Sequence, residues 1–443
     1  MTVAQKLATY GATLHNATLP ADVIHHAKRA VVDWYAALIP GAAEAPAQML
    51  ELALVDDLDR GASRLALGRS ATPRTAALIN GTAAHTVEVD DIYRHAIYHP
   101  GAPTIAAALA QAQALDASGL AFLKGVVAGY EISTRIGASM GRAHYRFWHN
   151  TGTVGTFGAA AAAATLLKLD ATRYAHALCT SATMASGLQQ AFRMDSMSKP
   201  LHAGHAAEAG LLAAAAAAAG FTGSLDVIDG DAGLGVAMSN GPDWDNTVTT
   251  LGRDFHITDM TFKNHACCGH TFAPIDGAQA LQAQMGVSAE DIESIHIGTY
   301  APALDVAGNF DPQTAPEARF SVPYVVATAL LYGSVRLAAF TEERLRDPRI
   351  RGLMARIVLT VDPALDAAFP GQRAARVRIM ARDGRQGEYL QPTRKGDPDA
   401  PLSDEDLNAK FLELAAPVLG DGAAAQLLQR IWQLDGMPSV RSI

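Results

Sequence analysis

Apolar residues recur at three- and four-residue intervals through most of the first 240 residues, a pattern that predicts helices. One helix is predicted to begin after Pro20, to carry Val23, Trp34 and Leu38 on one face, and to stop at Pro40. The same spacing predicts further helices over 74–88, 104–115, 119–137, 153–167, 172–188 and 204–219. Alanine and glycine line many of their faces, which lets helix backbones approach closely in a bundle.

The pattern changes near residue 262, where alternating and β-branched segments appear among the helices. Strands are predicted at 294–300, 356–361, 375–381 and 387–390, and helices at 271–285 and 324–331. Asp383 and Gly384 have the residue types of a hairpin turn between the last two strands. Residues 263–395 are therefore predicted to form a smaller α+β domain.

Two further positions mark helix ends. Gly220 follows the predicted helix 204–219 at the place of a C-terminal cap glycine. Ser403 and Asp406 form a capping-box pattern, which predicts a last pair of helices that return to the first domain. The predicted fold class is thus mainly α, with a large all-α domain from residues 1–262 and 396–443 and the α+β domain from 263–395.

Composition narrows the function classes. Of 443 residues, 49% are hydrophobic and 18% charged, as expected for a large helical enzyme with an extensive subunit interface. The net charge of −9 and the lack of a basic stripe argue against a nucleic-acid partner. Three cysteines give no disulfide framework, and neither a targeting segment nor an apolar run long enough for a bilayer is found. We therefore expect a cytoplasmic protein without membrane association.

The segment 80–101 gathers three histidines, three carboxylates, two tyrosines and one arginine in an otherwise alanine-rich chain. Predicted helices flank it, and Pro100 and Gly101 end the element that carries His99. Titratable groups concentrated where an apolar chain is interrupted are typical of an active-site loop on a helical scaffold. An ordinary exposed loop is the alternative for this segment taken alone.

Two other segments place polar residues beside helices. His149 comes directly before a predicted helix, where the helix dipole favours a bound anion and lowers the pKa of a histidine. Lys199, in the segment 194–205 that also contains His202, precedes Pro200. A residue before proline is biased toward an extended backbone, which predicts a fixed cation suited to a substrate carboxylate. A capping or core histidine and a solvated loop lysine are the respective alternatives.

The segment 265–270 holds two histidines and two cysteines, which raises the possibility of zinc. The spacing matches no common zinc finger, and the adjacent Cys267 and Cys268 point to opposite sides of an extended chain, so no metal is predicted. His95 and His99 are four residues apart, but Pro100 disfavours the regular helix that would bring them together.

Some standard chemistries are excluded. No P-loop and no Gly-x-Ser-x-Gly elbow is present, and the glycine-rich segment 230–235 lacks the spacing of the dinucleotide fingerprint.

The segment 316–324 contributes two more candidates. Arg319 is a candidate carboxylate ligand, and Tyr324 is a phenol at the start of an apolar helix. A tyrosine in that position more often serves packing.

Taken together, these segments resemble the MmgE/PrpD family, whose members include 2-methylcitrate dehydratase, cis-aconitate decarboxylase and iminodisuccinate epimerase. The resemblance runs nearly end to end, with all motifs in the family's order. It rests on 80–85 followed by Asp90-Asp91 and His99-Pro100-Gly101, on 198–204, on 220–223, on 262–270, on 316–324 and on 402–411.

The resemblance implies a large all-α domain made from both chain ends, a smaller α+β lid domain, a homodimer, and no metal or organic cofactor. It also implies a cleft between the domains for small di- or tricarboxylates. By position, the catalytic residues are Asp90, Asp91, His99, His149 and Tyr324. The residues assigned to substrate binding are Lys199, Lys263, Arg319, His202, Cys268 and His270.

Two departures from the family bear on the substrate. Dehydratase and decarboxylase members usually have Thr after the Asp-Asp pair and Ser after His-Pro, whereas this chain has Ile92 and Gly101, with one extra residue before His99. The decarboxylases also carry a histidine five residues after the lid lysine, where this chain has Cys268.

The expected chemistry is proton abstraction from the carbon next to a carboxylate. The dianion formed needs charge stabilisation, which fixed cations such as Lys199 and Lys263 would supply. His99 or His149 would take the proton, oriented by a neighbouring aspartate, and Tyr324 or the other histidine would return one. Loss of hydroxide makes the enzyme a dehydratase, and return of the proton to the other face makes it an epimerase.

The predicted function is a cofactor-independent lyase for a small di- or tricarboxylate. Dehydration of the 2-methylcitrate type is favoured, with epimerisation or decarboxylation as alternatives among which the residues do not choose. The contrasting hypothesis is a structural helical dimer or a metal-binding protein. Stoichiometric zinc that is lost when Cys267 and Cys268 are replaced would support that hypothesis.

Overall fold

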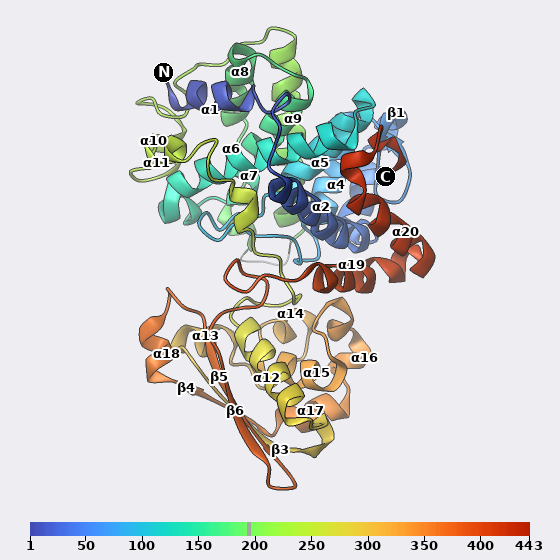
Figure 1. Ribbon diagram of the computed structural model, residues 1–443, viewed down its shortest axis with the longest axis vertical. Helices are drawn as coiled ribbons and strands as arrows, with labels where there is room; N and C mark the ends of the chain where they lie inside the picture. Colours follow the sequence, from blue (N-terminus) through green and yellow to red (C-terminus); the bar gives the residue numbers. More distant parts are fainter. Residues whose placement is uncertain (193–195) are drawn as a thin grey trace. The chain divides into compact units, whose positions relative to one another are not determined.

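The computed structural model describes residues 1–192 and 196–443, and helices dominate it (Figure 1). The chain divides into two compact units. The first contains Met1–Thr261 together with Ser403–Ile443, and the second contains Phe262–Leu402. The prediction of a mainly α fold is confirmed.

The first unit is a helical bundle built around one fully buried helix. Every residue of α7, Asn150–Leu166, is buried, and α5, α6 and α9 pack against it. The long helices of this unit are α1 Val3–Gly11, α2 Ala21–Ala42, α3 Ala45–Ala53, α4 Pro73–Ala84, α5 Gly101–Leu115, α6 Gly119–Tyr145, α8 Ala171–Ala182, α9 Ser198–Ala218, α19 Asp404–Leu419 and α20 Asp421–Trp432. Two short helices, α10 Leu234–Met238 and α11 Asn246–Thr249, complete it.

Small residues bring these helices together, as the sequence predicted. A Cβ at Gly41 of α2 would lie 1.9 Å from the carbonyl oxygen of Ala83 in α4. A Cβ at Gly210 of α9 would lie 2.4 Å from the carbonyl oxygen of Thr156 in α7. Since both obstacles are backbone atoms, a larger side chain at either glycine would have to separate two helices.

Several predicted helix ends are wrong. Helix α2 continues through Pro40 to Ala42, because a proline in the last turn removes only one helical hydrogen bond. Helix α4 stops at Ala84 instead of residue 88, because His85 has left the helical conformation (φ −100°, ψ 0°). Helix α8 stops at Ala182 instead of residue 188.

The cap predictions are confirmed. Gly220 has φ +97°, and the amide of Phe221 donates to the carbonyl of Ala216, as in a Schellman motif. The amide of Asp406 donates to the hydroxyl of Ser403, whose own amide donates to the Asp406 carboxylate.

The first unit also contains a two-stranded antiparallel sheet, β1 Leu58–Arg64 and β2 Ser70–Ala71, that the sequence analysis did not predict. Its residues are mostly polar or exposed. Only Leu58 and Ser63 of β1 are buried, so the chain offers no clear alternation of apolar and polar positions there.

The second unit has a four-stranded sheet in the order β4-β3-β5-β6. The strands are β3 Ile292–Thr299, β4 Ile357–Val361, β5 Ala375–Ala381 and β6 Gln386–Gln391. β3 runs parallel to β4 and antiparallel to β5, and Gly384 (φ +87°) lies in the hairpin between β5 and β6. The four predicted strands and this hairpin are confirmed.

Helices of the second unit pack on the sheet and on one another. Helix α12, Phe272–Met285, packs against β5 and β6, and α15, Val322–Tyr332, packs against α12 (Figure 1). The shorter helices are α13 Ala301–Ala307, α14 Ala315–Ala318, α16 Glu342–Leu345, α17 Pro348–Met354 and α18 Pro363–Ala368. All five lie between β3 and β5 in the chain.

The C-terminal helices belong to the first unit, where α19 packs against α2. Lys410 of α19 is fully buried, and its Nζ donates to Asp33 Oδ1 of α2 at 2.6 Å and to the carbonyl oxygen of Val89 at 2.7 Å. The C-terminal segment thus holds the loop that carries Asp90 and Asp91.

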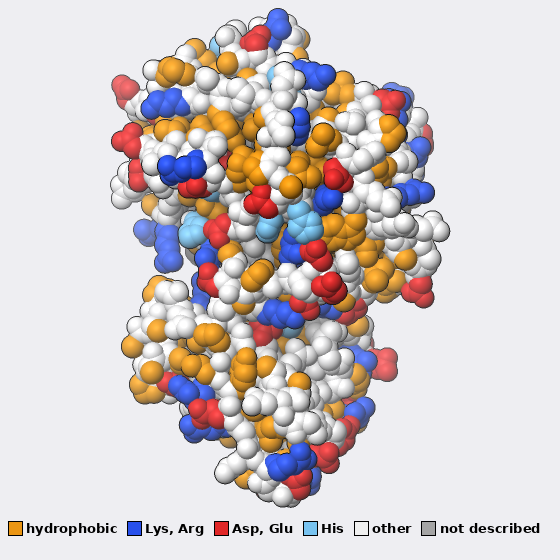
Figure 2. Space-filling model, in the orientation of Figure 1, with side chains coloured by type: hydrophobic (Ala, Val, Ile, Leu, Met, Phe, Trp, Pro, Cys, Tyr) orange, Lys and Arg blue, Asp and Glu red, His pale blue; other side chains and the backbone are white. Residues whose placement is uncertain are grey.

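The surface carries charges of both signs. On the face that Figure 2 displays, Lys and Arg side chains are interspersed with Asp and Glu. Among the described residues, no helix combines the length and the apolar character needed to cross a bilayer.

Candidate active site

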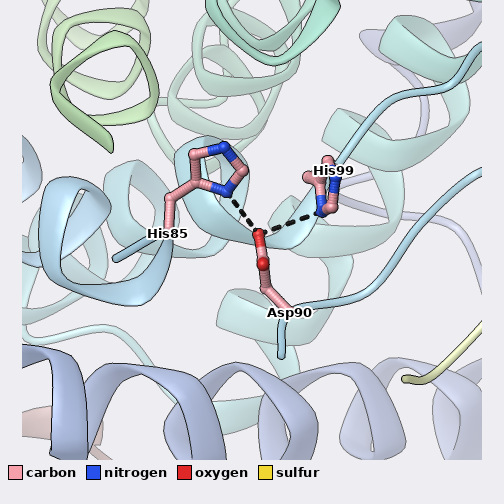
Figure 3. Close-up of side chains that lie close together, drawn as sticks. All are labelled: His85, Asp90 and His99. Carbon is pink, nitrogen blue, oxygen red and sulfur yellow. Dashed lines mark hydrogen bonds and ion pairs between the residues drawn. The ribbon is translucent and has the colours of Figure 1, made fainter. Parts of the chain in front are cut away.

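The loop between α4 and α5 brings two histidines to one carboxylate. His85 Nδ1 lies 2.7 Å from Asp90 Oδ2 in a hydrogen bond, and His99 Nδ1 lies 3.2 Å from the same oxygen. Figure 3 shows both rings turned toward the Asp90 side chain. The His99 contact has the distance of an ion pair but not the alignment of a hydrogen bond. Catalytic hydrogen bonds are often loose before substrate binds.

The electrostatics make Asp90 the charged member of this cluster. Burial raises the pKa of Asp90, but the interactions with His99 and His85 outweigh burial and hold it well below the usual value. Burial lowers the pKa of His85 to about 4, against the opposing effect of Asp90. At neutral pH, we therefore assign an ionised Asp90 that accepts the Nδ1 proton of a neutral His85.

His99 is the member of the cluster that can meet a solute. Its side chain is 14% exposed, whereas those of His85 and Asp90 are 0% and 1% exposed. Since Nδ1 faces the carboxylate, Nε2 lies on the opposite side of the imidazole ring. A partly exposed imidazole backed by a buried carboxylate is the arrangement of a general base or acid.

His149 lies beside the cluster and is the N-cap residue of α7, as the sequence predicted. Its ring stacks on His85 with centroids 5.3 Å apart, and its Nδ1 lies 3.1 Å from His202 Nδ1. The pKa of His149 is well below the usual value, but the main cause is burial, followed by the neighbouring His85 and His99. The helix dipole is thus not needed to explain a neutral His149.

Of the two adjacent carboxylates, only Asp90 contacts a histidine in the described structure. Asp91 instead accepts from the amide of Gly101 at 3.0 Å and from the Tyr130 hydroxyl at 2.8 Å. Burial, with the charge of Asp33, raises its pKa to about 7. These contacts fix the first turn of α5, and we interpret Asp91 as a positioning residue.

Lys199 adds a cation near the histidines. Its Nζ is paired with Glu88, lies 5.1 Å from the centroid of the Phe192 ring, and helps to lower the pKa values of His85 and His202. The predicted extended backbone is wrong, because Lys199 lies in the first turn of α9. Proline is tolerated in a first turn, where amides have no helical acceptor. Met194 and Asp195, at the start of the predicted segment 194–205, lie outside the described residues.

The other predicted site residues belong to the second unit. Lys263 is buried, Cys268 is half-buried, and His270 Nδ1 lies 2.9 Å from the hydroxyl of Tyr300. The guanidinium of Arg319 lies over the Phe340 ring.

Tyr324 is also in the second unit, and its surroundings count against the predicted role in returning a proton. Its side chain is fully buried, and its hydroxyl donates to the carbonyl oxygen of Ala339 at 2.6 Å. Burial raises its pKa to about 12. We interpret Tyr324 as a packing residue of α15.

One cluster has the geometry of a metal site. Among residues 1–192 and 196–443, ligand atoms of His85, Asp90 and His99 lie within 4.8 Å of one another, a set that suits zinc. Asp90 Oδ2, however, already faces both imidazole nitrogens, so a metal would have to replace those contacts.

Cys267, which the sequence analysis considered as a zinc ligand, is not in this cluster. Its Sγ lies 3.0 Å from the Thr271 hydroxyl, and burial raises its pKa to about 12, which disfavours a thiolate ligand.

Sequence reasoning missed His85 as a site residue, although it lies in the quoted motif 80–85. The signal that could have found it was its place in the last turn of the helix predicted over 74–88, five residues before Asp90. The contribution of Glu88 was also missed. Its φ of +62° is a conformation that side chains rarely adopt, and this cannot be inferred from local residue types.

A helical scaffold with a buried carboxylate behind a partly exposed imidazole has the arrangement expected of an acid–base site. The sequence profile of the MmgE/PrpD N-terminal domain matches residues 5–247, and that of the MmgE/PrpD C-terminal domain matches residues 265–434. The protein therefore belongs to the MmgE/PrpD family.

Three relatives illustrate the activities known in this family. The cis-aconitate decarboxylase-like protein oryM of Aspergillus oryzae is 28% identical, over 97% of this chain and 93% of its own length. Human cis-aconitate decarboxylase is 28% identical over 82% of this chain and 77% of its own length. The 2-methylcitrate dehydratase of Salmonella typhimurium is 33% identical, over 24% of this chain and 23% of its own length. By their names, these relatives are lyases or similar to lyases.

Acid is expected to destabilise the first unit. The native pKa of His85 is about 4 and its unfolded pKa about 6.5, so the unfolded chain binds more protons between these values and stability falls as pH falls. His149 and His202 act in the same direction, whereas Asp91, with its pKa raised to about 7, opposes them. Urea unfolding at pH 7 and pH 5 measures the net effect.

A single substitution isolates the part played by His85. His85→Asn should remove about 2 kcal/mol of the acid-induced loss between pH 7 and pH 5, since one pKa unit corresponds to about 1.4 kcal/mol. His95→Asn is the matched control, because His95 is exposed and pairs with Asp259 at the surface. An equal pH dependence in all three proteins would contradict the assignment of a neutral, buried His85.

Proposed function

We propose that the protein is a lyase acting on a small tricarboxylate, and that His99 moves the proton at the carbon next to a carboxylate. The observation that carries this proposal is the pairing of a partly exposed His99 with the buried, ionised Asp90. Asp90 would hold the ring through Nδ1 and stabilise the imidazolium form, which leaves the proton transfer to Nε2.

The same histidine serves two lyase reactions. In dehydration, His99 takes the proton from the α-carbon, the electron pair forms the double bond, and hydroxide leaves the β-carbon and is protonated to water. In decarboxylation of an unsaturated acid, the bond to the departing carboxylate breaks and its electron pair shifts through the double bond. The carbon at the far end then accepts a proton from protonated His99, and carbon dioxide is released.

Charge stabilisation would come from Lys199. Its charge helps to lower the pKa values of His85 and His202, and Glu88 pairs with it. A substrate carboxylate would compete with the Glu88 carboxylate for this cation. A lysine held by packing and by an ion pair stabilises developing charge with little reorganisation.

Dehydration and decarboxylation are the two candidate reactions, and a different observation favours each. Cys268, which stands where the decarboxylases of the family carry a histidine, favours dehydration. The long alignments with cis-aconitate decarboxylase and its oryM relative, against 24% coverage for the dehydratase, favour decarboxylation. We rank decarboxylation of a tricarboxylate first on this ground, with dehydration second. Epimerisation would require the proton to return to the opposite face, for which the site offers His149 as a second, neutral imidazole.

An assay of products separates these outcomes. The protein is incubated with cis-aconitate, 2-methylcitrate, citrate and an aspartate-derived dicarboxylate, and carbon dioxide and unsaturated products are quantified. Release of one equivalent of carbon dioxide per product indicates a decarboxylase, and a new olefinic acid without carbon dioxide indicates a dehydratase. Absence of both from every tricarboxylate would contradict the proposal. The homodimer expected from the family resemblance remains a prediction, which light scattering of the purified protein tests.

A further inference from the structure

Three buried polar atoms in the segment 85–99 have no hydrogen-bond partner among residues 1–192 and 196–443. They are His85 Nε2, Asp90 Oδ1 and His99 Nδ1. All three belong to the cluster in which Asp90 Oδ2 faces both imidazole rings (Figure 3). Because unsatisfied buried polar atoms cost free energy, the hydrogen bonds within this cluster do not account for all of its polar groups.

The cluster also has the dimensions of a zinc site. One ligand atom from each of His85, Asp90 and His99 lies within 4.8 Å of the other two. In a tetrahedral site with bonds of about 2.0–2.1 Å, neighbouring ligand atoms lie about 3.3 Å apart. The distance from His99 Nδ1 to Asp90 Oδ2, 3.2 Å, is already close to this value. The distance from His85 Nδ1 to the same oxygen, 2.7 Å, would have to open by about 0.6 Å.

The types of ligand select the kind of metal ion. Two imidazoles and one carboxylate favour zinc and similar transition-metal ions, whereas magnesium and calcium prefer oxygen ligands. Three protein ligands leave the fourth position for water, as in open zinc sites. The His99 side chain is 14% exposed, which gives an ion access from solvent. Lys199, whose charge acts on His85, is paired with Glu88, and this pairing reduces its repulsion of a bound cation.

We propose that His85, Asp90 and His99 form an inhibitory binding site for zinc or a similar divalent cation. The ion would bind Nδ1 of both rings and the Asp90 carboxylate, in place of the contacts between them. Each neutral imidazole would then carry its proton on Nε2. His99 could neither accept a proton at Nε2 nor form the imidazolium that returns one, so turnover would stop.

The metal site and its inhibitory effect are separate claims. Binding of zinc to the cluster does not depend on the proposed function. The inhibition rests on that function, because the function assigns proton transfer to Nε2 of His99.

Calorimetry with zinc chloride and metal-free protein at pH 7 tests the binding claim. We expect one zinc ion per chain in the native protein. His85→Asn and His99→Asn should each raise the Kd at least tenfold, since loss of only a hydrogen bond to a metal ligand costs about 10- to 100-fold in affinity.

Two variants serve as controls for this titration. His95 is exposed and pairs with Asp259, and Cys267 Sγ contacts the Thr271 hydroxyl outside the cluster. His95→Asn and Cys267→Ser should therefore bind zinc as the native protein does. X-ray absorption of the zinc-loaded native protein should show nitrogen and oxygen ligands at about 2.0–2.1 Å and none of the sulfur ligands at about 2.3 Å that cysteines would give.

The inhibition claim is tested on the tricarboxylate that gives product. Because a tricarboxylate itself chelates zinc, a metal buffer sets the free zinc concentration in the assay. We expect half-maximal inhibition at the Kd found by calorimetry, and full recovery of activity when a chelator removes the metal.

Native-like zinc affinity in folded His99→Asn, sulfur ligands in the absorption spectrum, or failure of the native protein to bind zinc would overturn the proposal. His99 is partly exposed, so this variant keeps the test valid if His85→Asn does not fold. Zinc that binds the cluster but leaves turnover unchanged would overturn the inhibitory role. Failure of the proposed function is distinguishable, because zinc would then bind with the expected pattern among the variants although no tricarboxylate is converted.

Discussion

His99→Asn is expected to lower kcat by a factor of about 10² to 10⁴ while leaving KM within a few-fold of the native value. Asparagine keeps a polar group that can face Asp90 but cannot accept and donate a proton as imidazole does. The loss should therefore fall on the chemical step and not on binding. Steady-state kinetics on the tricarboxylate that gives product measures both constants.

The control for this substitution lies four residues earlier in the same loop. His95 is exposed and pairs with Asp259 at 3.2 Å, so His95→Asn should retain nearly full activity. Asp90→Asn should resemble His99→Asn, because it removes the charge behind the ring. If His99→Asn kept native kcat while His149→Asn abolished it, His149 would be the proton-transfer residue and our assignment would be wrong.

Lys410→Met is expected to destabilise the protein by about 3–5 kcal/mol, the usual cost of removing one partner from a buried ion pair. The substitution leaves Asp33 buried without the ammonium group that donates to it and removes the hydrogen bond to Val89. Because Val89 directly precedes Asp90, kcat should fall as well, although Lys410 is not placed at the reacting atoms. Denaturant unfolding and steady-state kinetics measure the two effects.

An exposed ion pair gives the comparison. Arg346 pairs with Glu342, and their side chains are 81% and 79% exposed, so Arg346→Met should change the free energy of unfolding by less than about 1 kcal/mol. Equal stability of Lys410→Met and Arg346→Met would contradict the view that the C-terminal helix supports the catalytic loop.

Much of the fold could be predicted from periodicity alone. The four strands of the second unit and the capping box at Ser403 follow from short-range patterns, and the structure bears them out. The ends of α4 and α8 could not be predicted, because tertiary contacts override helix propensity there. His85, for example, leaves α4 and hydrogen-bonds to Asp90.

Less of the candidate site than of the fold could be predicted from the sequence. The loop 80–101 stands out by composition, but its residue types could not decide between Asp90 and Asp91. That decision depends on Gly101 and Tyr130, which bind Asp91 from positions 10 and 39 residues away.

Solvent-derived deuterium in the product tests the central claim most directly. The native protein and His99→Asn are incubated with cis-aconitate and 2-methylcitrate in deuterated buffer, and proton and deuterium NMR follow the carbon next to the carboxylate. We predict that the native enzyme places one deuterium at that carbon of the decarboxylated product, or removes the hydrogen from that carbon in a dehydration, and that His99→Asn does so at least a hundredfold more slowly. Decarboxylated product formed by the native enzyme without solvent deuterium, or equal rates of deuterium incorporation or of product formation in His99→Asn and the native enzyme, would contradict the account.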